Sequence, residues 1–362
     1  MNQNLAQTAI FHGVDKPFEI IDVPIQTVPD TVLVRVSLAT ICGSDLHTVS
    51  GRRGMDVPCV LGHEAIGVVD APTSLKSDKG EPLEVGDRIT WSLTTACGEC
   101  HYCSHINLPQ KCESMFKYGH ALSEGENALT GGFSTHIQLK KGTSIHKIPD
   151  TLTDEEVVPI NCALGTVVNG IESIGTEPGK SAVVHGAGML GIYAACYLRS
   201  KGYKIVGVVD KQDVRLNTVL RYGATHTFNA ETTSKDEISK QLDDLTDGRG
   251  VDLVVEVSGA PPALPDMIDW LGIGGKCLTL GYVYPLDGIP FNVHQLVTKC
   301  ITLKGVHNYH PNIMDKIVSF IEEQKSNYPF AELIGKVYPL SEINDAFTHA
   351  FKQEIVRIAI SP

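Results

Sequence analysis

The stretch Ser181-Ala-Val-Val-His-Gly-Ala-Gly-Met-Leu-Gly191 decides the fold of this chain. Residues 181–185 have the pattern of a short buried strand and residues 192–201 that of a helix, so a GxGxxG motif lies between the two. Asp210 ends the next apolar run and falls 19 residues after Gly191. A glycine motif in this context, followed by an acidic residue at about this distance, is typical of a dinucleotide-binding βαβ unit.

The glycines of this motif have separate tasks in such a unit. Gly186 permits the tight turn, Gly188 lets the backbone approach the pyrophosphate, and Gly191 lets the helix pack on the strand. The pyrophosphate then meets the positive end of the helix. Asp210 accepts hydrogen bonds from the adenosine ribose and repels a 2′-phosphate, so we predict NAD in preference to NADP, with the cation Lys211 tempering that preference. The predicted cofactor contacts are Gly186, Gly188, Met189, Leu190, Gly191, Asp210, Lys211 and Arg215 and, near the ends of later strands, Ser258 and Gly281.

Strand and helix patterns alternate from about residue 150 to about residue 298, which predicts a doubly wound parallel sheet. The first 90 residues differ, because proline and glycine interrupt them often and no helical period lasts. Within them, residues 31–38 carry an apolar side chain at every second position, the mark of a half-buried strand. A chain of 362 residues is too long for one compact core. We therefore predict an α/β protein of two domains and expect residues 299–362 to return to the first.

Charge and hydropathy exclude several classes of protein. The net charge of −12 argues against binding to nucleic acid or to an anionic membrane surface. No uninterrupted apolar run approaches the roughly 20 residues of a membrane-spanning helix. Residues 1–15 have neither the basic start nor the apolar centre of a signal peptide, so we expect a cytoplasmic protein.

Four of the ten cysteines lie within one stretch, residues 97–112. The CxxCxxC spacing of the first three lets successive thiolates bind one ion, and a fourth cysteine closes a tetrahedron. A closed four-thiolate site is typical of structural zinc. An iron–sulfur cluster uses similar spacing, but the Cys-Pro continuation is missing and the fourth cysteine is isolated, which favours zinc. The predicted ligands are Cys97, Cys100, Cys103 and Cys112.

A second group of possible metal ligands lies earlier in the chain. The run Cys42-Gly-Ser-Asp-Leu-His47 follows the predicted strand, and Gly62-His63-Glu64 comes about twenty residues later. Thiolate and neutral imidazole suit zinc, and a catalytic zinc needs three protein ligands and an open position. Taken alone, Cys42 and His63 are more often a buried core thiol and a core histidine, so the interpretation depends on the rest of the chain.

Together these motifs resemble those of the zinc-dependent medium-chain alcohol dehydrogenases, in the same order and over nearly the whole chain. The resemblance implies a GroES-like β-rich catalytic domain (residues 1–160, with the zinc loop at about 96–113), a Rossmann domain (161–298) and a return to the catalytic domain (299–362). It also implies two zinc ions per chain, NAD as cofactor and a homodimer or homotetramer. One departure is visible, because eight residues separate Cys103 from Cys112 where many relatives have seven.

The same resemblance implies roles for the residues around a catalytic zinc. Cys42, His63 and Cys162 are the implied ligands. Glu64 is expected behind the zinc, where it can exchange in as a further ligand. Asp45 is expected to orient His63.

The implied reaction transfers a hydride between a small-molecule alcohol and NAD. We expect the alcohol to be a secondary one. Ser44 is expected to accept the alcohol proton and His47 to pass it towards solvent, with Thr166 beside the nicotinamide. Two alternatives are a non-catalytic NAD-binding zinc protein and a reductase of an activated double bond. The complete set of zinc ligands and proton carriers argues against both.

Three stretches, 108–120, 161–166 and 305–311, resemble more particularly a bacterial subgroup of these enzymes associated with phosphonate catabolism. We take this as a hint about the substrate only. The basic residues Arg52, Arg53 and Lys117 could hold an anionic group of that kind. Solvated surface charges are the more common state of such residues, and we predict that state here.

Overall fold

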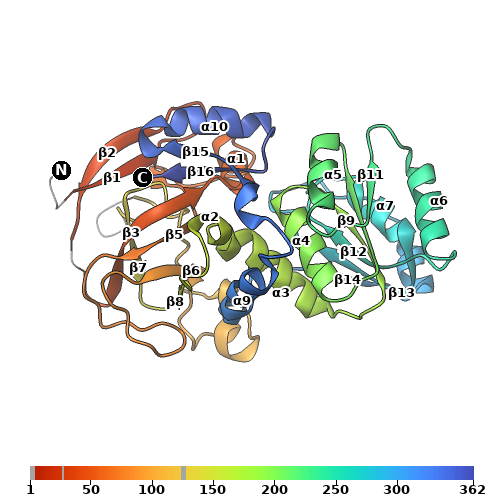
Figure 1. Cartoon of the computed structure of the whole chain (residues 1–362), viewed down its shortest axis with the longest axis horizontal. Helices are drawn as coiled ribbons and strands as arrows, with labels where there is room; N and C mark the ends of the chain where they lie inside the picture. Colours follow the sequence, from red (N-terminus) through yellow and green to blue (C-terminus); the bar gives the residue numbers. More distant parts are fainter. Residues whose placement is uncertain (1–4, 27, 124–127) are drawn as a thin grey trace. The chain divides into compact units, whose positions relative to one another are not determined.

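The structure is a computed structural model, and it describes residues 5–26, 28–123 and 128–362 (Figure 1). Its contacts divide the chain into two compact units. The first, here called the β-rich unit, contains Met1–Gly165 and His310–Pro362. The second, here called the parallel unit, contains Thr166–Tyr309.

Antiparallel pairing forms most of the β-rich unit. A three-stranded sheet has the order β2-β1-β4, and a seven-stranded sheet has the order β15-β16-β3-β5-β6-β8, with β7 paired to the first half of β3. The alternation predicted for residues 31–38 is confirmed, because Val32, Val34 and Val36 are buried in the core of this unit. The strands are β1 (Leu5–Phe11), β2 (Glu19–Pro24), β3 (Thr31–Thr40), β4 (Cys59–Val60), β5 (Glu64–Val69), β6 (Arg88–Thr95), β7 (His136–Lys140), β8 (Thr143–Lys147), β15 (Ile334–Pro339) and β16 (Arg357–Ser361).

The parallel unit is a six-stranded sheet in which every pair of neighbours is parallel. Its order is β11-β10-β9-β12-β13-β14, which is the 3-2-1-4-5-6 order of the Rossmann fold. The strand order therefore reverses between β9 and β12. The strands are β9 (Ser181–His185), β10 (Ile205–Asp210), β11 (His226–Asn229), β12 (Val251–Glu256), β13 (Leu271–Thr279) and β14 (Thr302–Gly305). The helices are α3 (Gly165–Ile174), α4 (Met189–Ser200), α5 (Asp213–Leu220), α6 (Lys235–Leu245), α7 (Ala263–Trp270) and α8 (Val293–Thr298).

The parallel unit extends to Tyr309, beyond the predicted boundary at residue 298. The reason is β14, which pairs with β13 and so adds the last strand to the parallel sheet. The segment from His310 onward belongs to the β-rich unit, where β16 pairs with β3. Its helical elements are η5 (Pro311–Ile313), α9 (Met314–Gln324), η6 (Phe330–Leu333), η7 (Leu340–Glu342) and α10 (Ile343–Lys352).

One helical stretch, residues 154–174, is long and apolar enough to span a membrane by length and composition. It joins α2 (Asp154–Val157), η4 (Ile160–Leu164) and α3. It is not an uninterrupted apolar run in the sequence, because charged residues interrupt the apolar ones at its start. Since 72% of its most apolar window is buried, the stretch resembles a core helix of a globular protein.

Candidate active site

Four side chains that can bind a metal ion converge in the β-rich unit. They are Cys42, His63, Glu64 and Cys162, here called the Cys42 cluster, and their donor atoms all lie within 4.8 Å of one another. Two sulfurs, one imidazole nitrogen and one carboxylate oxygen form a donor set that suits zinc. The sequence therefore predicted correctly which residues come together here, although 98 residues separate His63 from Asn161, the residue before Cys162.

The imidazole of His63 is oriented by a buried carboxylate. Asp45 lies in the first turn of α1 (Gly43–Val49), directly after β3. Its Oδ2 accepts a hydrogen bond from the Cys42 backbone N–H at 2.8 Å, and its Oδ1 lies 3.2 Å from His63 Nδ1. Because Asp45 occupies Nδ1, Nε2 is the nitrogen that His63 can offer to a metal ion.

Cys162 reaches the cluster from η4, a turn of π-helix between α2 and α3. This helical stretch begins with a capping box, in which the Thr153 side chain accepts from the Glu156 N–H and Glu156 accepts from the Thr153 N–H. The Asn161 side chain donates to the backbone oxygens of His63 and Trp91, at 3.3 and 3.2 Å. Turns of π-helix often occur at functional sites, and this one packs against β5 and β6.

The two thiols of the cluster share a hydrogen bond. Donation from Cys162 lowers the pKa of Cys42 well below its usual range, so Cys42 is the thiolate of the pair. The same bond raises the pKa of Cys162, because it favours the protonated form of the donor. A metal ion with two sulfur ligands requires both thiolates, so binding it releases the shared proton.

Glu64 is fully buried, and both of its oxygens have partners. Arg357 Nη2 donates to Oε1 at 2.9 Å, and Thr40 Oγ1 donates to Oε2. Arg357 is itself buried and also donates to the backbone oxygen of Ile41. Arg357 could not be identified from the sequence alone, because its position in β16 is distant in sequence and carries no motif.

The two predicted proton carriers both lie on α1. Ser44 Oγ is 3.2 Å from His63 Nε2, so the hydroxyl lies at the metal-binding edge of the imidazole. His47 is half-buried. Burial lowers the pKa of His47, and the nearby cations Arg52 and Arg53 lower it further, although the Cys42 thiolate opposes them. A neutral imidazole at this position is able to accept a proton near pH 7.

The second predicted set of ligands, the Cys97 cluster, also comes together. It contains Cys97, Cys100, Cys103 and Cys112. Two of its sulfur–sulfur distances are 4.0 Å (Cys97 to Cys103) and 3.9 Å (Cys100 to Cys112). A tetrahedron of thiolates around zinc has edges of about 3.8 Å, given Zn–S bonds of about 2.3 Å. Backbone N–H groups of Glu99 and Cys100 lower the pKa of Cys97 to about 6, which prepares a thiolate at neutral pH. The geometry therefore fits structural zinc.

Replacing Cys103 with serine is expected to remove the metal of the Cys97 cluster. A structural zinc site contributes on the order of 10 kcal/mol to the folding of its ligands, so the variant should also unfold at a lower temperature. A colorimetric zinc assay should find one ion per chain in place of two. Cys300→Ser, which changes an exposed cysteine outside both clusters, is the control. A Cys103→Ser protein that keeps two zinc ions per chain would contradict the assignment.

The glycine motif has the predicted geometry at the carboxyl end of β9. Gly186 turns the chain with φ +114°. A Cβ on Gly191 would lie 1.9 Å from the Gly186 oxygen, so only glycine fits there. A Cβ on Gly188, at the N-terminus of α4, would meet no atom of the described chain within 4 Å, which leaves space beside the backbone for a phosphate group. Asp210 accepts hydrogen bonds from the N–H groups of Ala187 and Gln212, at 2.7 and 3.0 Å, so it lies against the motif.

A buried carboxylate that was not predicted from the sequence links two of the predicted cofactor contacts. Glu256 ends β12, and its Oε1 accepts from the N–H groups of Ser258 (2.7 Å) and Gly259 (2.6 Å). Its Oε2 accepts from the Gly281 N–H at 3.1 Å. Glu256 therefore ties the loops after β12 and β13 together beside the point where the strand order reverses, which is where Rossmann folds bind their ligand.

Comparison with known families decides the identity of the fold and its chemistry. Residues 28–150 match the alcohol dehydrogenase GroES-like domain, and residues 190–323 match the zinc-binding dehydrogenase family. The chain is also 30% identical over 330 residues to the 5-exo-hydroxycamphor dehydrogenase of Pseudomonas putida, with 90% of each protein covered. The chain belongs to the zinc-dependent medium-chain alcohol dehydrogenases. It is an NAD-dependent oxidoreductase of alcohols, and the non-catalytic alternative and the double-bond reductase are not favoured.

Solved structures agree with this assignment of the dehydrogenase. An alcohol dehydrogenase from Thermotoga maritima is 30% identical, covers 99% of both chains and superposes with a TM-score of 0.93. The benzyl alcohol dehydrogenase of Acinetobacter calcoaceticus is 26% identical, covers 99% of both chains and has a TM-score of 0.85. The predicted α/β architecture, with a GroES-like domain and a Rossmann sheet, is therefore confirmed, as are zinc and NAD as cofactors of the family.

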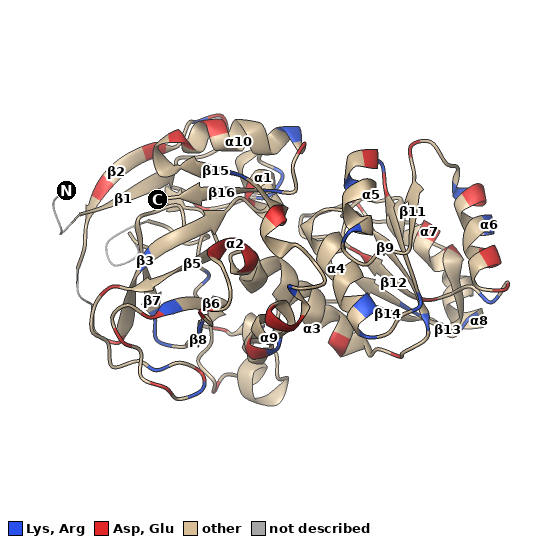
Figure 2. Cartoon of the chain, viewed as in Figure 1, with Lys and Arg blue, Asp and Glu red and all other residues tan. Residues whose placement is uncertain are grey.

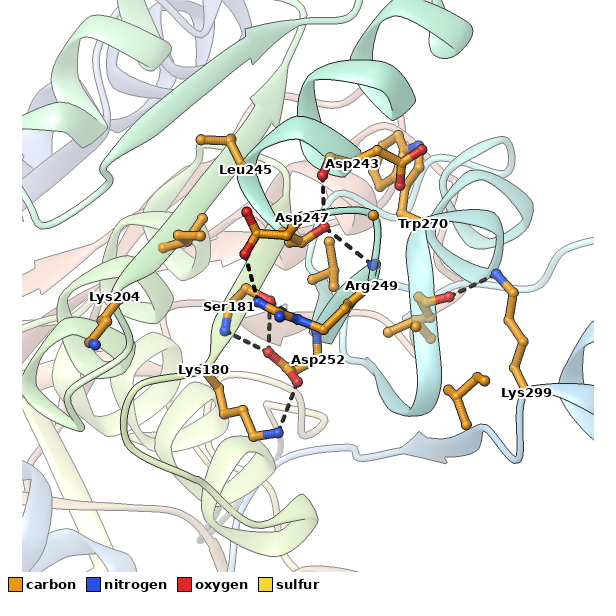
Figure 3. Close-up of a pocket in the computed structure, with 18 of the residues that line it drawn as sticks. Lys180, Ser181, Lys204, Asp243, Leu245, Asp247, Arg249, Asp252, Trp270 and Lys299 are labelled. Atoms are coloured by element: carbon orange, nitrogen blue, oxygen red, sulfur yellow. Dashed lines mark hydrogen bonds and ion pairs between the residues drawn. The ribbon is translucent and has the colours of Figure 1, made fainter.

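A cavity of about 1000 Å³ opens at the opposite edge of the dehydrogenase's Rossmann sheet, where β9, β12 and β13 begin (Figure 3). Three of the cations that line it already have polar partners. Lys180 Nζ lies 3.1 Å from Asp252, Arg249 lies 2.9 Å from Asp247, and Lys299 donates to the Leu271 oxygen at 2.7 Å. The glycine motif and Glu256 lie at the other ends of the same strands, so this cavity is separate from the expected cofactor site.

Charged residues of both signs are interspersed on each unit of the dehydrogenase, for example along α6 (Figure 2). Arg52 is exposed, as predicted. The prediction of solvated charges was wrong for Arg53 and Lys117, which are half-buried. The backbone of Lys117 pairs with that of Thr94 in an isolated antiparallel β-bridge, and the next residue is the buried Tyr118. The Lys117 backbone therefore lies inside the unit. Burial lowers the pKa of Lys117 to about 8, and the cation of Arg53 adds to this effect.

Proposed function

We propose that this dehydrogenase oxidises a secondary alcohol to a ketone, with NAD as hydride acceptor, at the Cys42 cluster. Cys42, His63 and Cys162 would bind the catalytic zinc, with Glu64 behind them, and the Cys97 cluster would bind the structural zinc. The observation that supports this proposal is the convergence of four donor atoms of the right kinds within 4.8 Å. The hydroxyl of hydroxycamphor is that of a secondary alcohol, and this relative's name supports extending that substrate class here.

Zinc and NAD supply different parts of the chemistry. When bound, zinc acts as a Lewis acid that acidifies the substrate hydroxyl, and NAD accepts the hydride from the carbinol carbon. The protein's own residues then have to position the alcohol and remove its proton. Asp45 holds His63 in one orientation, and the Glu64–Arg357 pair fixes the carboxylate behind the cluster.

The proton of the alcohol is removed by Ser44 and His47, which both lie on α1. Ser44 Oγ accepts the hydroxyl proton of the alcohol and passes its own proton on, and His47 carries it towards solvent. The lowered pKa of His47 keeps its imidazole neutral and ready to accept. Thr166 would lie beside the nicotinamide. The dinucleotide would contact the glycine motif, Asp210, Lys211, Arg215, Ser258 and Gly281.

Two further expectations belong to this proposal. We expect the enzyme to work in the cytoplasm. We also expect it to assemble as a homodimer or homotetramer, which size-exclusion chromatography with light scattering would test.

The function is tested by following NADH absorbance with a panel of primary and secondary alcohols. Secondary alcohols should have a kcat/KM roughly tenfold above primary alcohols of the same length. NAD should support faster turnover than NADP. Removing zinc by chelation should abolish turnover, and adding zinc back should restore it. Full activity in the metal-free protein would refute a catalytic role for zinc.

A further inference from the structure

Three basic side chains gather beside the Cys42 cluster, and the reaction proposed above does not use them. Arg53 lies in the turn after α1, and Lys117 and His120 follow the Cys97 cluster in the chain. The His120 ring lies 5.1 Å from the His63 ring, centroid to centroid. Lys117 interacts electrostatically with Arg53 and with the sulfur groups of Cys162 and Cys42. All of these residues belong to the β-rich unit. We call Arg53, Lys117 and His120 the basic group.

The hydrogen bonds of His120 define its protonation and fix Arg53. His120 Nδ1 lies 2.9 Å from the backbone oxygen of Tyr118, which can only accept, so Nδ1 carries the proton. Nε2 is then an acceptor, and Arg53 Nη1 donates to it at 3.0 Å. Burial lowers the pKa of His120 well below its usual range, so the ring stays neutral. Arg53 is therefore held by a neutral partner that leaves its charge uncompensated.

Neither cation has a carboxylate partner. Among residues 5–26, 28–123 and 128–362, no carboxylate oxygen lies within 4.0 Å of the side-chain nitrogens of Arg53 or Lys117. The Cys42 cluster does not need these charges, since a divalent ion balances its two thiolates and Arg357 balances Glu64. Half-buried cations without a counter-ion are costly, so their convergence next to the reacting centre indicates an anion that arrives with the substrate.

We propose that Arg53 and Lys117 bind an anionic oxyacid group of the substrate, with His120 positioning Arg53, so that the enzyme acts on an alcohol carrying a phosphoryl or carboxylate group near its carbinol carbon. This assignment rests on the proposed function of the Cys42 cluster. The planar guanidinium of Arg53 can bind two oxygens at once, and the flexible ammonium of Lys117 adds a point charge. The basic group thereby selects the substrate, while the cluster performs the chemistry.

The test compares four alcohols of similar size in the NAD-reduction assay. They are 1,2-propanediol, its 1-phosphate, 2-hydroxypropylphosphonate and 3-hydroxybutyrate. The wild type should prefer at least one anionic alcohol over the neutral diol by roughly tenfold or more in kcat/KM. The three anionic alcohols distinguish a phosphate ester, a phosphonate and a carboxylate as the group that the enzyme binds.

Substitutions then show which residues cause the preference for anionic alcohols. Lys117→Gln and Arg53→Gln should each lower the ratio of kcat/KM between the anionic and neutral alcohols by roughly 10- to 100-fold, mainly through KM. Lys117→Arg, which keeps the charge, should retain most of the ratio. Lys141→Gln changes an exposed lysine outside the basic group and should leave the ratio unchanged.

A binding measurement separates failure of this inference from failure of the proposed function. Calorimetric titration with inorganic phosphate should show binding to the wild type and loss of binding in the Lys117→Gln protein. If the neutral diol is oxidised, no anionic alcohol is preferred and phosphate does not bind, the anion site is refuted and the proposed function stands. If no alcohol is oxidised but phosphate binds through Lys117, the anion site stands and the proposed function fails.

Discussion

Replacing Cys42 with serine is expected to lower kcat by roughly 10³-fold or more, while the Kd for NAD stays near that of the wild type. Serine is a poor ligand where zinc requires a thiolate, so the variant loses the Lewis acid, which is equivalent to about 4 kcal/mol of transition-state stabilisation. NAD binding should be preserved, because the glycine motif and Glu256 belong to the parallel unit and Cys42 belongs to the β-rich unit. Turnover by NADH absorbance, NAD binding by fluorescence titration and zinc content together check this result.

The matched control for this variant is Cys59→Ser. Cys59 is a buried cysteine of the same unit, but it lies outside both metal clusters. Its replacement tests the cost of putting serine in the core without touching a metal ligand. We expect two zinc ions per chain and turnover within about a factor of three of the wild type, since Cys59 belongs to neither group of metal ligands. Normal turnover in Cys42→Ser, with only one zinc ion per chain, would contradict the catalytic assignment.

Replacing Arg357 with methionine is expected to lower the free energy of unfolding by about 3–5 kcal/mol. The reason is that Glu64, which is fully buried, loses the guanidinium 2.9 Å from its Oε1. The carboxylate must then either stay ionised without its partner or take up a proton. Urea denaturation followed by tryptophan fluorescence measures the loss, and Trp91 in the core of the β-rich unit is a suitable reporter.

A double variant shows whether the loss comes from the unpaired charge. Glu64→Gln removes the negative charge, so Glu64→Gln combined with Arg357→Met should be more stable than Arg357→Met alone by about 1–3 kcal/mol. A double variant that is less stable than the single one by the full cost of Glu64→Gln would mean that Arg357 stabilises the fold by packing alone.

Patterns that are local in the sequence predicted their part of the structure well. The glycine motif, Asp210 and the alternation of strands and helices identified the parallel sheet, because strand, turn and helix follow one another within about 30 residues. The Cys97 cluster was equally predictable from the sequence, since all four ligands lie within residues 97–112. The Cys42 cluster needed the resemblance to a family, because Cys162 is far from the other ligands and has no motif of its own.

The residues that the sequence did not reveal depend on tertiary structure. Arg357 lies in an ordinary strand, and only the pairing of β16 with β3 brings it to Glu64. Lys117 was named from the sequence, but its burial was not foreseen, because Lys117 and His120 lie in irregular chain where no periodicity predicts burial. Glu256 could have been found, because an acidic residue that ends a buried strand and precedes Ser258-Gly259 needs backbone donors nearby.

The pairing of Glu64 with Arg357 also has a consequence for the nascent protein on the ribosome. The two residues are 293 positions apart, and the parallel unit is translated between them. At about 5–20 residues per second, Glu64 is made roughly 15–60 s before its partner. The core around β3 and β5 stays incomplete during that time, whereas residues 166–309 can already collapse into their own sheet. We therefore expect the Rossmann sheet to be the first part of this enzyme to resist protease during synthesis, and the metal site to mature only after β16 has joined β3.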